Sequence, residues 1–387
     1  MRFLSSGESH GKALCGIIDD FPSGANIDFD FINNELKRRQ SGYGRGMRMQ
    51  IEDDKLEIIS GIRNGITLGS PISFLIFNKD WQNWKDRLSP EALDIKDIEN
   101  SEKILNPRPG HADFSGYVKY RFDDIRNVIE RSSARETVIR VAAGSFAKIL
   151  LEVFNVFVYS FVEKIGRFEI NIKNFNKDLF LLAEKSDVRC PDEKISIRMK
   201  NEIDAAARNG DTLGGKFTVF VKGLPAGLGS YCQWDRRIDA KIAHAVMSIP
   251  AIKAVEIGSG VSSASSTGLG FHDEIFYDDR QGFYRKTNNA GGIEGGITNG
   301  EDLVVSAYMK PIPTTSQGLR TINLKTKNEQ ISLKERSDVC AVPAASVIGE
   351  SMISLVLADA FQEKFGRDNV TEMFENYKNY INYLRNI

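Results

Sequence analysis

The chain has 387 residues, enough for one large domain or two, and its hydrophobic content of 41% is sufficient for an extended core. Its 51 Lys and Arg residues are balanced by 52 Asp and Glu residues, so it lacks the overall positive field on which non-specific nucleic-acid binding depends. Recognition of an anion must therefore rest on a local group of charges.

Cysteine usage and the N-terminus indicate the compartment of the protein. The cysteines are widely spaced without a C-x-x-C pair, so the sequence predicts reduced thiols, no disulfide framework and no metal site. They are Cys15, Cys190, Cys232 and Cys340. The N-terminus lacks the apolar core of a signal peptide, and we expect no run of 18 apolar residues that would span a bilayer. A cytoplasmic protein is therefore expected.

The first chemically distinctive residue is His10, which lies in the glycine-flanked run 7–11. This run precedes a predicted strand over residues 14–18, so the histidine should lie in a loop. A loop histidine can exchange a proton near neutral pH, although many histidines in turns have no function. Both interpretations stay open from this segment alone.

A predicted helix over residues 29–36 runs into a basic segment, residues 37–48, with five cations and no acid. Arginines in a glycine-rich loop suit the binding of a small, multiply charged anion. A solvated basic face is the plain alternative. RNA binding is the rival use, but Tyr43 is the only aromatic residue there that would stack on a base.

A turn with an arginine and a histidine follows a predicted strand over residues 72–76 and a polar surface excursion over residues 81–98. In the run 108–113, a proline and a glycine fix a turn that should present Arg108 and His111 together.

The centre of the chain carries a helix start with two arginines. Ser133 is followed three residues later by Glu136, as in a capping box, so a helix is predicted to start at Ala134. Arg131 and Arg135 flank this start, where the helix dipole disfavours cations. A bound phosphate or carboxylate would resolve the conflict, and pairing of the arginines with surface acids is the alternative.

The remaining elements alternate between strands and helices. Periodicity predicts strands over residues 153–162, 217–221, 254–257 and 303–309. It predicts helices over residues 134–149, 203–208, 238–246 and 344–365, of which the third would be capped by Asp235. Residues 170–196 look like a charged insertion. The second half partly mirrors the first, so an internal duplication is compatible with the order, although no repeated motif establishes one.

Two glycine-rich segments, residues 258–270 and 289–296, lack the G-x-G-x-x-G spacing of a Rossmann dinucleotide site. Paired glycines instead let the backbone approach a flat ring or a phosphate, and a mobile loop is equally compatible. Further on, two prolines stiffen the loop at residues 310–316. Asp338 follows Arg336 by two residues, and such a pair can serve as base and anion anchor, or the aspartate can cap the next helix.

Four short motifs together resemble the chorismate synthase family over essentially the whole chain. They lie in residues 7–11, 108–113, 131–144 and 336–338. Each motif is short, but their joint occurrence in this order is specific. The loop that begins at Lys310 contains Pro-Ile-Pro where some members of the family have a shorter form.

The resemblance implies an α+β fold with a helical layer sandwiched between antiparallel β-sheets, residues 1–387 as one domain, and an assembly of four identical chains. It implies a carbon–oxygen lyase that eliminates phosphate from 5-enolpyruvylshikimate 3-phosphate to give chorismate, the last common step toward the aromatic amino acids. Reduced FMN is required without net redox change. NADPH would supply the reducing equivalents, directly or through a separate reductase. No nucleic-acid or membrane partner is expected.

The resemblance also assigns site residues by motif position. His10 and His111 would be the catalytic histidines, one protonating a developing anion and the other tuning the reduced flavin, and Asp338 would be the base that works with flavin N5. The flavin-contact positions would be Arg131, Ser132, Ser133, Pro250, Ala251, Gly295, Lys310, Pro311, Ile312, Pro313, Thr314 and Arg336. The substrate or NADP positions would be Arg39, Arg45, Arg48, Arg108 and Arg135.

Two other functions are distinguishable by experiment. A flavin-dependent oxidoreductase of another kind would consume NADPH in step with product. An anion- or RNA-binding module without chemistry would bind with a steep salt dependence and form no product.

Overall fold

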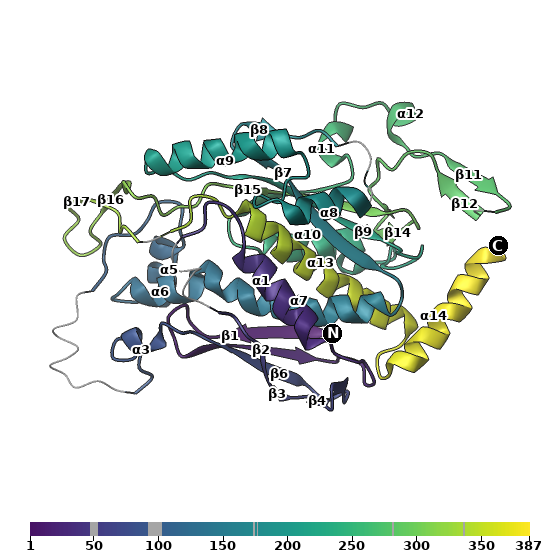
Figure 1. Ribbon diagram of the computed structural model, residues 1–387, viewed down its shortest axis with the longest axis horizontal. Coiled ribbons are helices and arrows are strands. Elements are labelled where there is room, and N and C mark those ends of the chain that lie inside the picture. The colour runs from purple at the N-terminus through teal and green to yellow at the C-terminus, as the bar shows by residue number, and fades with distance from the viewer. Residues whose placement is uncertain (47–52, 92–102, 173–174, 176, 281, 336) are drawn as a thin grey trace.

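The chain forms a layer of helices between two antiparallel β-sheets, as a computed structural model shows (Figure 1). The structure describes residues 1–46, 53–91, 103–172, 175, 177–280, 282–335 and 337–387. The α+β sandwich that the sequence implied is confirmed.

Each sheet turns one apolar face toward the helices. The first sheet contains, in spatial order, β1 (Arg2–Ser6), β2 (Ala13–Asp19), β6 (Ile72–Phe77) and β3 (Glu57–Ser60). The second contains β10 (Ile252–Ile257), β15 (Leu303–Met309), β9 (Gly215–Lys222), β7 (Phe157–Ile165) and β8 (Phe168–Glu169). In β6, Ile72, Phe74 and Ile76 are fully buried, because alternate side chains of a strand point to the same face.

Three helices fill the space between the sheets: α1 (Phe29–Gln40), α7 (Thr137–Glu152) and α13 (Val342–Phe365). α7 packs against β2, α13 packs against β7 and β9, and the two helices pack closely on each other. Their close approach depends on Gly144 of α7, because a Cβ atom at this position would lie 2.3 Å from the Cβ atom of Ser351. A larger residue would force the layers apart.

The other elements lie at the periphery of this sandwich, except that α10 packs on α13 and β10 inside it. The helices are α3 (Trp81–Trp84), α5 (Asp113–Tyr120), α6 (Arg126–Ser132), α8 (Lys177–Lys185), α9 (Glu193–Arg208), α10 (Ile238–Met247), α11 (Gly260–Ser263), α12 (Gly268–Phe271) and α14 (Val370–Arg385). The short strands are β4 (Ile62–Arg63), β5 (Ile66–Thr67), β11 (Ile275–Asp278), β12 (Gly282–Arg285), β13 (Ile293–Glu294), β14 (Ile297–Thr298), β16 (Arg320–Ile322) and β17 (Glu329–Ile331).

The long apolar helix predicted over residues 344–365 is confirmed as α13, which begins two residues earlier, at Val342. By length and composition it would be able to cross a bilayer, contrary to the expectation that no such run occurs. However, 78% of its apolar window is buried inside the protein, and it contacts both α7 and the second sheet. Its composition is that of a helix buried on all sides in a protein core.

The two halves of the chain repeat one order of elements. The first half runs β1, β2, α1, β3, hairpin β4–β5, β6 and α7, and the second runs β7, β9, α10, β10, hairpin β13–β14, β15 and α13, apart from inserted elements. Equivalent strands also pair in the same order, because β1-β2-β6-β3 in one sheet corresponds to β7-β9-β15-β10 in the other. Tertiary structure thus shows a repeat that no sequence motif announced.

A threonine in each hairpin repeats the same hydrogen bonds. Thr67 Oγ1 accepts the N–H of Ala25 at 2.9 Å and donates to the carbonyl of Pro22 at 2.7 Å. Thr298 makes the corresponding bonds in the second half, also at 2.9 and 2.7 Å. One contiguous hydrophobic core draws on both halves. These observations support the proposal that residues 1–387 form one domain with an internal duplication.

Two predicted starts in the middle of the chain were displaced. The helix predicted from Ala134 begins there as a 3₁₀ turn and continues as α7 from Thr137. The strand predicted from Val153 begins only at Phe157, since Val153 still caps α7.

One other predicted helix start and one predicted cap were wrong, although α10 begins at Ile238 as predicted. The helix predicted from Ile203 begins at Glu193, because the side chain of Asp192 accepts the N–H of Ile195 at 2.8 Å. Asp235 lies in a 3₁₀ turn, Trp234–Arg236, so it does not cap α10.

A buried ion cluster links α1, α7 and α13. Glu350 is fully buried in the middle of α13, with its carboxylate 2.9 Å from Arg38 and 3.2 Å from Arg189 and in contact with Lys148. Ser160 of β7 also donates to this carboxylate. Burial raises the pKa of Glu350, but the three cations outweigh burial and hold the pKa well below its ordinary value.

We predict that Glu350→Ala lowers the free energy of unfolding by about 3–5 kcal/mol, because it removes the buried carboxylate that three cations share and leaves them only Glu35 and Glu184. Urea unfolding at one fixed protein concentration measures this change. Since the pKa in the folded state is depressed, the contribution of Glu350 is present above the ordinary carboxyl pKa and is lost as the pH falls below it. The control is Glu169→Ala, which removes the exposed pair with Lys164 and should cost about 0–1 kcal/mol. Equal losses in the two variants would contradict the prediction.

Candidate active site

His10 lies in the loop between β1 and β2 and is held by Glu130 of α6. Its Nδ1 atom is 3.0 Å from both carboxylate oxygens of Glu130, and its backbone N–H donates to Oε2 at 2.8 Å. The ring packs against Trp84, with the ring centroids 4.2 Å apart. Burial raises the pKa of Glu130, but the bonds from His10 outweigh burial and lower it below the ordinary value. Glu130 is therefore a buried, ionised partner of His10.

His111 lies in the turn before α5 and is held by Asp113, the first residue of that helix. Its Nδ1 atom is 2.5 Å from Asp113 Oδ1. Arg108 supports the same carboxylate, with Nε 2.8 Å from Oδ2 and Nη2 3.1 Å from Oδ1. Burial raises the pKa of Asp113, but the bonds from His111 and Arg108 lower it well below its ordinary value. The turn does present Arg108 and His111 together, as predicted.

A bridge of opposite charges connects the two histidine units. Arg126 Nη1 lies 3.4 Å from Glu130 and 2.9 Å from Glu335. Glu335 in turn lies 3.7 Å from Arg108 Nη1. The order of charges between the histidines is Glu130, Arg126, Glu335, Arg108 and Asp113. Residues far apart in the sequence are thus held in one electrostatic chain.

Arg131 occupies a different helix end from the one predicted. It lies in the last turn of α6, where the helix dipole favours a cation, and donates to the carbonyls of Ser5 and Gly7 at 3.0 and 2.9 Å. The predicted conflict between Arg131 and the positive end of a helix was therefore wrong. The helix that follows begins beyond Ser133, after a break in the chain direction.

The predicted capping box at the start of α7 is half formed. Ser133 Oγ accepts the N–H of Arg135 at 3.3 Å, as a capping serine should. Glu136 pairs with Arg140 at 2.9 Å instead of completing the box. The hydroxyl of Ser132 donates to a backbone carbonyl of α6 at 2.6 Å. These side chains order the segment that lies next to the His10 loop. Ser9, the residue before His10, donates its hydroxyl to Ser133 Oγ at 3.1 Å.

Three arginines and two aspartates meet where α1 ends and α7 begins. Arg135 lies 2.5 Å from Asp54, Arg39 lies 3.7 Å from the same carboxylate, and Arg45 lies 2.9 Å from Asp338. Burial lowers the pKa of Arg39 to about 9. The positive charges of Arg45 and Arg135 also lower this pKa, whereas Asp54 and Asp338 raise it. This group therefore carries more positive than negative charge in a buried setting.

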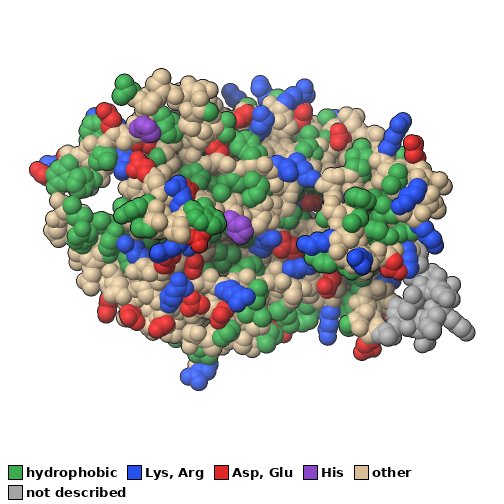
Figure 2. Space-filling model, turned by 180° about the vertical axis from the view of Figure 1, so that it is seen from behind, with side chains coloured by type: hydrophobic (Ala, Val, Ile, Leu, Met, Phe, Trp, Pro, Cys, Tyr) green, Lys and Arg blue, Asp and Glu red, His purple; other side chains and the backbone are tan. Residues whose placement is uncertain are grey.

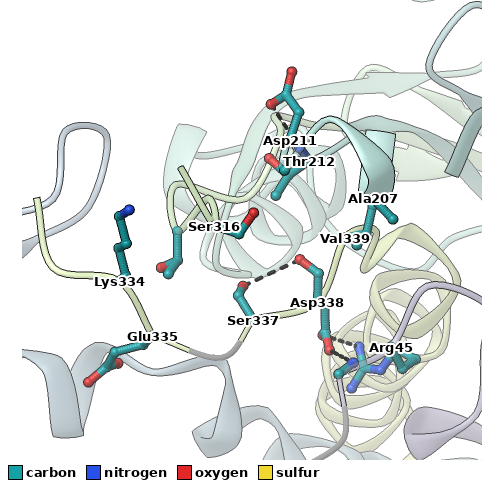
Figure 3. A pocket seen from close by; sticks show the side chains of 13 residues that line it. Arg45, Ala207, Asp211, Thr212, Ser316, Lys334, Glu335, Ser337, Asp338 and Val339 are labelled. Carbon is teal, nitrogen blue, oxygen red and sulfur yellow. Dashed lines mark hydrogen bonds and ion pairs between the residues drawn. The ribbon is translucent and has the colours of Figure 1, made fainter. Parts of the chain in front are cut away.

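A cavity of about 510 Å³ opens beside these charges. Arg45, Thr314, Glu335 and Asp338 contribute to its lining, together with the end of α9. Figure 3 shows the ion pair between Arg45 and Asp338, of which Asp338 lies on the segment that leads into α13, with Ser316 and Thr212 across the space from them. Thr314 accepts a bond from Arg108 at 2.9 Å, so the His111 unit adjoins the cavity. The His10 unit reaches it through Glu335.

The loop that begins at Lys310 packs beside the His111 turn. Lys310 Nζ donates to the carbonyl of Gly110, and its backbone N–H donates to the carbonyl of Ala251 at 3.0 Å. The carbonyl of Ile312 accepts from Thr212 at 2.7 Å. Three further flavin candidates lie in the same segments. Pro250 belongs to the turn with Ala251, and Pro311 and Pro313 belong to the loop that begins at Lys310. The structure therefore brings together most of the predicted flavin-contact positions.

Gly295 lies apart from them, in the turn of the β13–β14 hairpin next to α10. Its φ of 61° is followed by a φ of 85° at Gly296, as in a two-residue hairpin turn. In the first half, Asn64 occupies the equivalent place with a φ of 53°. A Cβ atom on Gly295 would meet no atom within 4 Å. Glycine at this position is therefore not required by the packing of the chain.

Two predicted ligands, Arg48 and Arg336, lie outside the described residues. Within the part of the chain that the structure describes, no group of three or more His, Cys, Asp or Glu side chains is arranged to hold a metal ion.

Sequence reasoning missed the acids that hold the cationic residues. Asp113 stands in the same run as His111, and Glu130 directly precedes Arg131, so proximity to a motif was an available signal for both. Glu335 directly precedes Arg336 in the same way, whereas Asp54 carried no comparable signal. Only the fold shows which cation each acid holds.

Comparison with known proteins identifies the family. The model of the chorismate synthase family matches residues 1–362. A chorismate synthase of Alkaliphilus metalliredigens is 52% identical over 98% of this chain and 99% of its own length, and one of Sulfurihydrogenibium sp. is 51% identical over 99% and 100%. A crystal structure of chorismate synthase superimposes with a TM-score of 0.80 at 40% identity and covers 100% of this chain and 98% of its own. The chain therefore belongs to the chorismate synthase family, and it is a carbon–oxygen lyase of aromatic amino acid biosynthesis.

Proposed function

We propose that this enzyme eliminates phosphate from 5-enolpyruvylshikimate 3-phosphate in the presence of reduced FMN and releases chorismate. The observation that carries the proposal is the Arg45–Asp338 pair in the wall of the cavity, to which Glu335 and Thr314 link the two histidine–carboxylate units. Family membership supplies the reaction class. The geometry supplies groups able to bind anions and to move protons.

The charge of the site fits the proposed ligands. The substrate and FMN together carry two phosphates and two carboxylates, and Arg39, Arg45 and Arg135 lie together with Asp54 and Asp338 beside the cavity. Guanidinium groups bind phosphate and carboxylate through paired N–H donors. The cost of burying Arg39, which lowers its pKa to about 9, would be relieved by a bound anion.

A flavin is proposed to lie beside the cavity, whose lining includes Thr314 of the loop of residues 310–314. The Ala251 turn, the loop of residues 310–314 and the Ser132–Ser133 segment would hold it, and Gly295 would approach it closely if the hairpin reaches the same ligand. When bound, the reduced flavin would supply electron density to the departing C–O bond. NADPH would be the source of its electrons, directly or through a separate reductase, with Arg39 or Arg45 as binding positions.

Side chains of the protein would carry out the proton transfers. Asp338 Oδ1 accepts the N–H of Gly46 at 2.7 Å while Arg45 holds Oδ2, so the carboxylate is fixed in place beside the cavity. In this role Asp338 takes the proton released in the elimination. His10 and His111, each backed by a carboxylate, would protonate or stabilise the negative charge that develops on the ligands.

Assembly into a homotetramer belongs to the same proposal. The β11–β12 hairpin projects from the body of the molecule in Figure 1 and exposes Ile275, Tyr277 and Phe283. Hydrophobic side chains gather on this arm at the left of Figure 2. Exposed apolar surface of this kind is typical of contacts between chains. We also propose a cytoplasmic location, which the free thiols of all four cysteines support.

The first test of the proposal is anaerobic phosphate release from 5-enolpyruvylshikimate 3-phosphate. We expect release with reduced FMN and none above background with oxidised FMN, because only the reduced ring can donate electron density. NADPH consumption is followed in parallel. Consumption in step with product would indicate another flavin oxidoreductase, and equal rates with oxidised FMN would overturn the proposal.

The second test concerns the base. Asp338→Asn keeps an oxygen for the Gly46 N–H but cannot accept a proton, so we expect turnover to fall by roughly 10²- to 10⁴-fold. Single-turnover kinetics measure the change. The control is Asp123→Asn, an exposed aspartate paired with Lys103, which should keep normal turnover. Near-normal turnover of Asp338→Asn would remove this residue from the mechanism.

The third test addresses the anion site. Arg45→Gln removes one guanidinium from the cavity, and a charge-assisted hydrogen bond is worth about 1.5–3 kcal/mol, so inorganic phosphate should bind roughly 10- to 100-fold more weakly. Titration calorimetry at low ionic strength measures the affinity. Arg367→Gln, which removes a surface pair with Asp20, is the matched control. Equal phosphate affinity in both variants would show that Arg45 does not bind the anion.

A further inference from the structure

The contacts of His111 determine which of its ring nitrogens carries the proton. Nδ1 lies 2.5 Å from Asp113 Oδ1 and 3.1 Å from Arg108 Nη2. The first contact needs Nδ1 to be a donor, whereas the second would need it to be an acceptor. An unprotonated Nδ1 would place its lone pair against a carboxylate oxygen at the shorter distance, which is repulsive. The ring therefore carries a proton on Nδ1 and donates it to Asp113.

His10 is held in a parallel way. Its Nδ1 is 3.0 Å from each carboxylate oxygen of Glu130, and a carboxylate that is ionised can only accept. Its ring is fixed on a second side by Trp84. Both carboxylates are buried, with exposures of 1% for each side chain, whereas the imidazoles are 16% and 17% exposed. Each histidine thus has its Nδ1 held by a buried carboxylate, whereas Nε2 of His111 has only a longer contact, 3.4 Å from Arg108 Nη2, among the described residues.

We propose that Asp113 and Glu130 are positioning residues, each of which accepts the Nδ1–H of a histidine and so reserves Nε2 for proton exchange with the ligand. This assignment rests on the proposed catalytic role of the two histidines. The tautomers themselves can be measured without any ligand. A carboxylate that fixes a histidine tautomer and ring orientation is a known device for making one nitrogen available.

The surroundings of Asp113 make one substitution decisive. Oδ2 accepts two hydrogen bonds from Arg108, from the backbone N–H at 3.0 Å and from Nε at 2.8 Å. In Asp113→Asn, the amide oxygen should therefore occupy the Oδ2 place, and its NH₂ group should face His111. Nδ1 would then have to accept a hydrogen bond, and the neutral ring would move its proton to Nε2. If Asp113 served only to pair with Arg108, the substitution would leave the tautomer of His111 unchanged.

The experiment is ¹⁵N NMR of the full chain labelled at histidine, at a pH at which the imidazoles are neutral. The sequence has only four histidines, of which His244 and His272 serve as internal references. We expect the Nδ1–H tautomer at both His10 and His111 in the wild type, and the Nε2–H tautomer at His111 in Asp113→Asn. Glu130→Gln is the reciprocal control, which should perturb His10 and leave the His111 tautomer unchanged.

The wild-type spectrum keeps the test decisive even if a variant does not fold. An Nε2–H tautomer at either site in the wild type would overturn the assignment for that site. Retention of the Nδ1–H tautomer of His111 in folded Asp113→Asn would also overturn it.

Kinetics then separate positioning from the proposed function. Asp113→Asn should lower kcat by about 10- to 100-fold with little change in KM for the substrate, the usual cost of removing a partner that orients a functional histidine. A switched tautomer with unchanged kcat would overturn the positioning role while the lyase function stands. The opposite outcome is that the wild-type tautomers are as expected but the enzyme releases no phosphate. That outcome would overturn the proposed function, and with it the catalytic role that Asp113 and Glu130 are inferred to serve.

Discussion

The site depends on one constraint, the close packing of α7 against α13 between the two sheets. Gly144 allows this packing, and the two helices begin at the same end of the layer. Arg39 at the end of α1 bonds the carbonyl of Ala134 just before α7, and the N–H of Val339 just before α13 bonds the carbonyl of Gly44. Three helix ends are thereby joined. Arg45, Asp338 and the arginine cluster meet because these ends meet.

Buried carboxylates are the second requirement, because isolated cations would not be tolerated in this setting. Asp54, Glu130, Asp113 and Glu350 each lie against Arg, Lys or His side chains inside the protein. Around Glu350, the carboxylates of Glu350, Glu35 and Glu184 share Arg38, Lys148 and Arg189. Beside the cavity, Arg39, Arg45 and Arg135 lie with Asp54 and Asp338. Arginines in such a place suit the anions proposed as ligands.

The repeated order of elements places two similar hairpins in the chain. Both hairpins have the threonine bonds that anchor them, so their backbone has the same structural role in each half. The turn residues differ, with Asn64 in one and Gly295 in the other, and both have a positive φ. The backbone of this turn is therefore compatible with asparagine as well as with glycine.

The sequence by itself determined the family, because four motifs in order are specific even though each is short, and it determined the local geometry of turns such as the one at Gly110. It also located His10, His111 and Asp338 as candidates, since histidine and aspartate next to glycine or arginine are visible in one dimension. It did not determine which charges meet. Asp54 lies 81 positions from Arg135, and Glu335 lies 209 positions from Arg126, so no local pattern links them. Tertiary structure alone decided these pairings, the place of Arg131 at the end of α6, and the internal repeat, because ion pairs and strand order depend on how distant segments pack and not on the residues between them.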